Sequence, residues 1–74
     1  MVSKHHMNWR VRSAEKSSEI TNEDLMFTCP LTCSQKDKAL IKEKLTATIQ
    51  EISQIVKDSP SEELVYLGID WFLV

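Results

Sequence analysis

The sequence predicts a mainly α-helical protein organised around one long helix over residues 35–57. This stretch contains no glycine, proline or aromatic residue, its apolar residues recur at helical spacing, and helix-start signals stand just before it and just after it. The favoured architecture is an antiparallel helical hairpin whose second helix begins near residue 60. An α+β arrangement is the alternative, with strands over residues 7–12 and 69–74 packed on the central helix.

The size and composition of the chain limit its functions. A chain of 74 residues has room for one domain with a small core, and such chains usually need a disulfide, a metal or a partner for stability. Nine basic residues nearly balance eleven acidic ones, and two cysteines are too few for a disulfide scaffold. No signal peptide or membrane span is apparent, so the expected location is intracellular, either cytoplasmic or nuclear.

The first 20 residues are expected to form a flexible arm ahead of one small helical domain over residues 21–74. They are mostly polar, which is typical of a flexible segment. Within them, Met7, Trp9 and Val11 alternate with polar residues, as in a half-buried strand. A lone strand cannot satisfy its own backbone groups, so this strand belongs only to the α+β alternative.

A short helix over residues 22–28 fits the next segment. Thr21 can cap its first turn, and the acidic Glu23 and Asp24 suit the positive end of a helix. Pro30 disfavours helical geometry at the residue before it, so the helix must end by then. A strand over residues 25–29 is the other interpretation.

The central helix has two overlapping start signals. Thr32 with Gln35 matches a capping box, and Ser34 with Asp37 offers a second start. The apolar residues then step by four, four, three and four, and they are Ile41, Leu45, Ile49, Ile52 and Val56. Leu40, Thr48 and Ile55 widen this stripe, so it is typical of a core-facing helix rather than a narrow coiled-coil seam.

The second helix is predicted from the residues after the central one. Ser59 suits the cap position, Pro60 the first helical position and Glu62 the third. A connection this short makes the two helices antiparallel. The apolar residues on one face of the second helix are Leu64, Leu67 and Trp71. Gly68 either lies inside this helix, at a cost of about 1 kcal/mol, or ends it and leaves residues 69–74 as a strand.

Catalysis and metal binding have little support in the sequence. The only histidines lie in the N-terminal arm, and there is no glycine-rich phosphate loop. Cys29 and Cys33 supply two zinc ligands where a structural site needs four. We therefore expect no enzyme activity, no cofactor and no small-molecule substrate. A minor metal or redox role of this cysteine pair stays as an alternative.

The first functional hypothesis is a small protein–protein interaction subunit or adaptor. A helical hairpin cannot cover all of the apolar residues, and exposed apolar surface marks sites that dock on a partner or self-associate. The expected contact residues are Ile41, Leu45, Ile49, Ile52, Val56, Leu64, Leu67, Trp71, Phe72 and Val74.

The alternative is a nucleic-acid-binding accessory protein. Basic residues crowd the first half of the central helix and recur in the arm, and basic clusters neutralise the phosphates of nucleic acids. The residues expected to make these contacts are Arg10, Arg12, Lys36, Lys38, Lys42 and Lys44.

Overall fold

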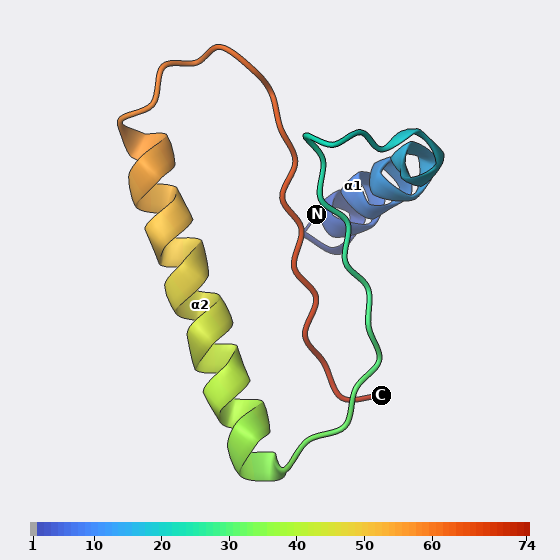
Figure 1. Cartoon of the computed structure of the whole chain (residues 1–74), viewed down its shortest axis with the longest axis vertical. Coiled ribbons are helices and arrows are strands. Elements are labelled where there is room, and N and C mark those ends of the chain that lie inside the picture. The colour runs from blue at the N-terminus through green and yellow to red at the C-terminus, as the bar shows by residue number, and fades with distance from the viewer. Residues whose placement is uncertain (1) are drawn as a thin grey trace. The chain divides into compact units, whose positions relative to one another are not determined.

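The computed structural model describes residues 2–74, and within this range it is helical without any strand (Figure 1). Helix α1 covers Val2–Lys16, the short 3-10 helix η1 covers Ser17–Glu19, and α2 covers Gln35–Lys57. The mainly helical class is confirmed, and the α+β alternative is disfavoured.

The chain divides into two compact units. One contains the described residues up to Cys29 together with Tyr66–Asp70, and so includes α1 and η1. The other contains Pro30–Val65 and Trp71–Val74, and so includes α2. Each unit therefore joins a helix to part of the C-terminal segment.

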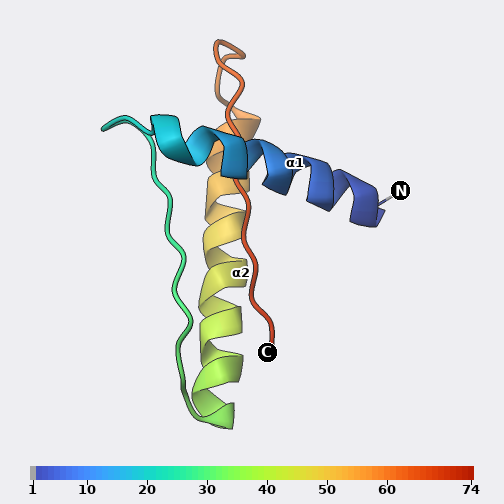
Figure 2. The ribbon, with the colours of Figure 1, turned by 90° about the vertical axis from the view of Figure 1, so that its right-hand side faces the viewer.

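Helix α2 begins and ends where the sequence predicts, and it runs without a break (Figure 2). Ser34 has an extended backbone, and its hydroxyl oxygen accepts a hydrogen bond from the Asp37 N–H at 3.0 Å. Of the two candidate caps, Ser34 is therefore the one used. Asp37 lies in the first turn and Lys57 in the last, so each charge suits its end of the helix dipole. The 23 residues form a rod about 34 Å long.

The predicted second helix is absent, and the hairpin is not confirmed. After α2, the Ser59 N–H bonds the Val56 carbonyl at 3.1 Å and the Glu62 N–H bonds the Pro60 carbonyl at 3.1 Å, but no helix follows in residues 58–74. Six of the eleven residues in 64–74 are β-branched or aromatic, and Gly68 lies near the middle of this stretch. These residues are weak helix formers, and a helix this short is marginal in water unless it packs on a surface.

Residues 2–16 form a helix where the sequence predicts a flexible arm or, in the alternative, a strand. The stretch contains no glycine or proline, and Lys16 lies in its last turn, where the dipole favours a cation. A helix satisfies its own backbone, whereas a strand here would need a partner strand. On the helix, Trp9, Arg10 and Ser13 share one side and are the half-buried residues of α1.

The predicted helix over residues 22–28 is reduced to one turn, so this prediction is wrong. The Thr21 N–H bonds a carboxylate oxygen of Asp24 at 2.9 Å, and the Asp24 N–H bonds the Thr21 carbonyl at 3.0 Å. The first of these bonds holds the pKa of Asp24 below its ordinary value. The cap thus forms, but Leu25 and Phe27 are 92% and 82% exposed and give a longer helix nothing to pack against.

No hydrophobic core is present among the side chains of residues 3–74. None of these side chains is buried, and the most covered of them are only half-buried. The helices are therefore stabilised mainly by their own hydrogen bonds and caps rather than by packing. Large apolar side chains remain accessible for contacts with other molecules.

Candidate interaction surface

The predicted apolar stripe lies along one side of α2 and is only partly covered. Ile41, Leu45 and Ile52 are half-buried. Ile49 and Val56, which belong to the same stripe, are 43% and 64% exposed. All five predicted contact residues of α2 thus share one accessible face, which we call the α2 face.

Thr48 is the polar residue that widens this face, and its hydroxyl is already satisfied. The Oγ1 atom donates to the carbonyl of Lys44 at 2.9 Å, one turn earlier in the same helix. A hydroxyl with an internal partner can be buried without losing a hydrogen bond. The α2 face can therefore be covered by an apolar surface along its whole length.

The C-terminal contact residues are divided between the two units and differ in exposure. Leu64 is 90% exposed, Phe72 is 75% exposed and Val74 is fully exposed. Trp71 is half-buried, and its indole nitrogen is buried without a hydrogen-bond partner among the described residues. Leu67 belongs to the unit of α1, whereas the other four belong to the unit of α2.

The basic residues of the nucleic-acid alternative are likewise divided between the two units. Arg10 and Arg12 belong to the unit of α1, and the four lysines belong to the unit of α2. At about 100° of rotation per residue, the lysines point in different directions around the helix rather than along one side. The lysines concerned are Lys36, Lys38, Lys42 and Lys44, and all four are exposed.

The structure also contains a cluster that sequence analysis missed, in which α1 contacts residues 66–70. The rings of Trp9 and Tyr66 stack with centroids 5.3 Å apart and an interplanar angle of 4°. The Tyr66 ring folds over Gly68, because a Cβ added there would lie 2.6 Å from Cζ of the tyrosine. Glycine therefore provides the space in which the tyrosine ring lies flat.

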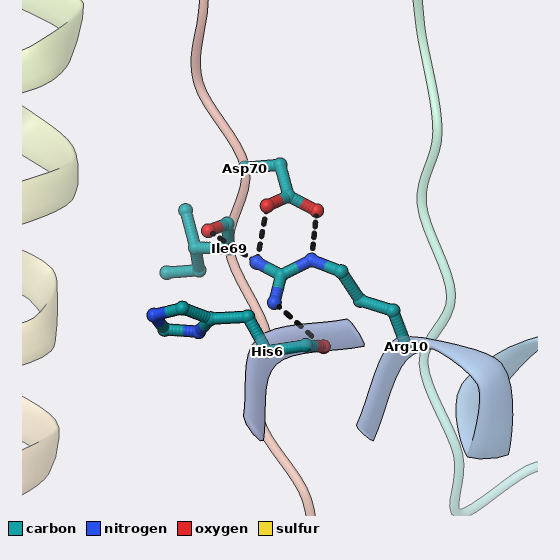
Figure 3. Close-up of polar contacts among 4 residues, drawn as sticks. All are labelled: His6, Arg10, Ile69 and Asp70. Atoms are coloured by element: carbon teal, nitrogen blue, oxygen red, sulfur yellow. Dashed lines mark hydrogen bonds and ion pairs between the residues drawn. The ribbon is translucent and has the colours of Figure 1, made fainter. Parts of the chain in front are cut away.

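An ion pair completes this cluster (Figure 3). The Arg10 Nε donates to one carboxylate oxygen of Asp70 at 2.7 Å, and Nη2 donates to the other. The same guanidinium donates to the carbonyl of His6 at 3.2 Å and to the carbonyl of Ile69 at 3.4 Å. The guanidinium of Arg10 is thus engaged in contacts within the molecule. We call Trp9, Arg10, Tyr66, Gly68 and Asp70 the α1 cluster.

The ion pair shifts the titration of both partners. The hydrogen bonds from Arg10 hold the pKa of Asp70 below its ordinary value of 3.8, and the Asp70 carboxylate raises the pKa of Arg10. Because the pKa of Asp70 is lowered in the folded contact, its ionised carboxylate stabilises that contact fully at pH values above the ordinary pKa of 3.8. That contribution is lost as the pH falls through the lowered value, so the contact is expected to persist from neutral pH to about pH 4.

Replacing Arg10 with glutamine is expected to raise the pKa of Asp70 towards 3.8, because the carboxylate loses its charged donors. The measurement is a pH titration of the Asp70 side-chain carbon by NMR. Arg12→Gln is the matched control, since Arg12 is exposed on the same helix and should leave this pKa unchanged. Equal shifts in the two variants would contradict the role given to Arg10.

Residues 2–74 contain no group of three or more histidine, cysteine, aspartate or glutamate side chains that could hold a metal ion. Cys29 and Cys33 are both exposed. One recess is lined by six residues that all belong to α2, between Ala39 and Gln50, so it is an open depression on one helix rather than an enclosed cavity. No described helix has the length and apolar character required to cross a membrane.

The α2 face and the α1 cluster are thus the two features with a defined geometry. One is an accessible apolar surface, and the other is an internal contact of the unit that contains α1. No protein-family model, curated protein or solved structure matches the chain.

Proposed function

We propose that this chain is a small interaction subunit that binds another protein chain through the α2 face. The observation that carries the proposal is a capped helix of 23 residues whose apolar side lacks a full cover. Contiguous apolar surface of this kind is costly in water and marks a docking site. An amphipathic helix typically presents residues one turn apart to such a partner, which is the spacing of Ile41, Leu45, Ile49, Ile52 and Val56.

The segment after Pro60 fits the same proposal. It carries helix-start signals at Ser59, Pro60 and Glu62, and most of its apolar residues are exposed. In the proposed bound state, residues 60–74 fold into a second helix on the surface of the partner, antiparallel to α2. The hairpin is then a property of the complex, because packing offsets the weak helix propensity of this segment.

A charge placed on the α2 face tests the proposal. Leu45→Asp is expected to weaken partner binding more than about a hundredfold, because an unpaired carboxylate would be buried in the contact. For the measurement, the chain is cross-linked to its partner inside the cells that naturally produce it, and the two are then isolated together. The affinity is then measured with the purified pair.

Ala47→Asp is the matched control, because it places the same charge on the opposite side of α2. It should retain binding, and circular dichroism should show that both variants keep the helix. If both variants bind the same proteins with equal affinity, the α2 face is not the docking site and the proposal is overturned.

A further inference from the structure

We infer that the α2 face binds the same face of a second copy of this chain, with the two α2 helices antiparallel. This inference rests on the proposed function and names the partner that the face accepts. It is carried by the pattern of the face itself and by the charges at its edge.

The α2 face matches itself when its direction is reversed. We place a two-fold axis between Thr48 and Ile49, at the middle of the stripe. The residues that then lie opposite each other are Ile41 with Val56, Leu45 with Ile52, and Thr48 with Ile49. No charged residue falls in these pairs, and the Thr48 hydroxyl keeps its bond to the Lys44 carbonyl. Such a self-complementary patch is what a two-fold dimer requires.

Charges along one edge of the face are complementary in the same arrangement. Lys44 and Glu51 are seven residues apart, so they lie on the same edge of α2. Antiparallel pairing brings this edge against the same edge of the second copy. At a rise of 1.5 Å per residue, Lys44 falls within about 3 Å, along the helix axis, of the level of Glu51 in the other copy. The symmetry makes two such lysine–glutamate pairs.

Lys38 selects between the antiparallel and the parallel arrangement. It lies on the line of the stripe, two turns before Leu45. In the antiparallel pair it meets the C-terminal end of the other α2, where the helix dipole is negative and Asp58 offsets the charge of Lys57. In a parallel pair Lys38, on the line of the stripe, would face Lys38 of the other copy. Like charges in contact oppose association, so the antiparallel arrangement is favoured.

The first experiment measures self-association of the full chain by sedimentation equilibrium, over concentrations from about 10 µM to 1 mM. The wild-type chain is expected to form dimers. Lys44→Glu and Glu51→Lys are each expected to weaken dimerisation about tenfold, because each makes two like-charge contacts. An equimolar mixture of the two variants should regain wild-type affinity, since the opposite charges again face each other.

Matched controls make the same charge changes on the opposite side of the helix. They are Lys36→Glu and Glu43→Lys, and both should dimerise like the wild type. Circular dichroism should show that all four variants retain α2. If the controls weaken dimerisation as much as the edge variants, net charge rather than the proposed edge contact controls association, and the inference is overturned.

Disulfide trapping tests the direction of pairing. In a chain with Cys29 and Cys33 replaced by serine, Ile41→Cys and Val56→Cys are prepared separately and then mixed. Oxidation should produce a disulfide between position 41 of one copy and position 56 of the other, found only in the mixture. Disulfides that form within each variant alone would indicate a parallel pair and overturn the antiparallel inference.

These results separate the inference from the proposed function. A wild-type chain that stays monomeric across the whole concentration range overturns the inference. In that case the co-isolation experiment still decides the proposed function, because a different protein lost by Leu45→Asp and retained by Ala47→Asp would be the partner of the α2 face.

Discussion

Replacing Ala47 with proline is expected to remove most of the helical content of α2. Proline removes a backbone donor and clashes with the preceding turn, at a cost of about 3 kcal/mol inside a helix. Ala47 lies near the middle of the 23-residue helix, so the pieces left, residues 35–46 and 48–57, are at or below the roughly 12–15 residues under which an isolated helix is marginal in water. Far-ultraviolet circular dichroism measures the loss.

The control for this variant introduces the same residue at the start of the same helix. Gln35 occupies the first helical position, where proline is tolerated because the N–H has no partner within the helix. Gln35→Pro should therefore keep the helical signal of the wild type. If both variants lose a similar share of the helical signal, the loss does not come from a break in the middle of α2.

Replacing Gly68 with alanine is expected to displace the Tyr66 ring from Trp9. The added methyl group would lie 2.6 Å from Cζ of the tyrosine and closer still to its hydroxyl oxygen, which is less than van der Waals contact allows. The backbone of Gly68 does not have a positive φ, so the effect is one of space and not of backbone strain. The measurement is the loss of ring-current shifts of Trp9 and Tyr66 in proton NMR.

Leu67→Ala is the matched control for the glycine variant. It changes the neighbouring residue, whose side chain is 57% exposed, and places no new atom against the tyrosine. The ring-current shifts of the stack should persist in this variant. Shifts that also persist in Gly68→Ala would contradict the close packing of Tyr66 on Gly68.

Helix α2 could be predicted from the sequence because every interaction that defines it is local. The spacing of its apolar residues, the cap at Ser34 and the restart signals at Ser59 and Pro60 all lie within a few residues of the helix. The stripe on its face followed from the same spacing. These features do not depend on what the rest of the chain does.

The α1 cluster could not be predicted, because its partners are far apart in the sequence, with Arg10 and Asp70 separated by 60 residues. Trp9 and Arg10 gave no sign that they would find Tyr66 and Asp70, and the alternation around Trp9 pointed to a strand instead. The prediction of a second helix after Pro60 was wrong for a related reason. Its start signals were correct for a helix, but without a surface to pack on they do not outweigh weak propensity.

The cap at Ser34 has a consequence for the speed of association. A helix of about 20 residues forms in about 0.1–1 µs, so α2 is complete long before two chains meet by diffusion. Its encounter with a partner should proceed at the rate of an ordinary docking reaction, about 10⁵–10⁷ M⁻¹s⁻¹. Residues 60–74 have no such prior helix. A helix of that length also forms within about 1 µs once it has a surface to pack on, so binding should show one concentration-dependent phase, set by the docking of α2.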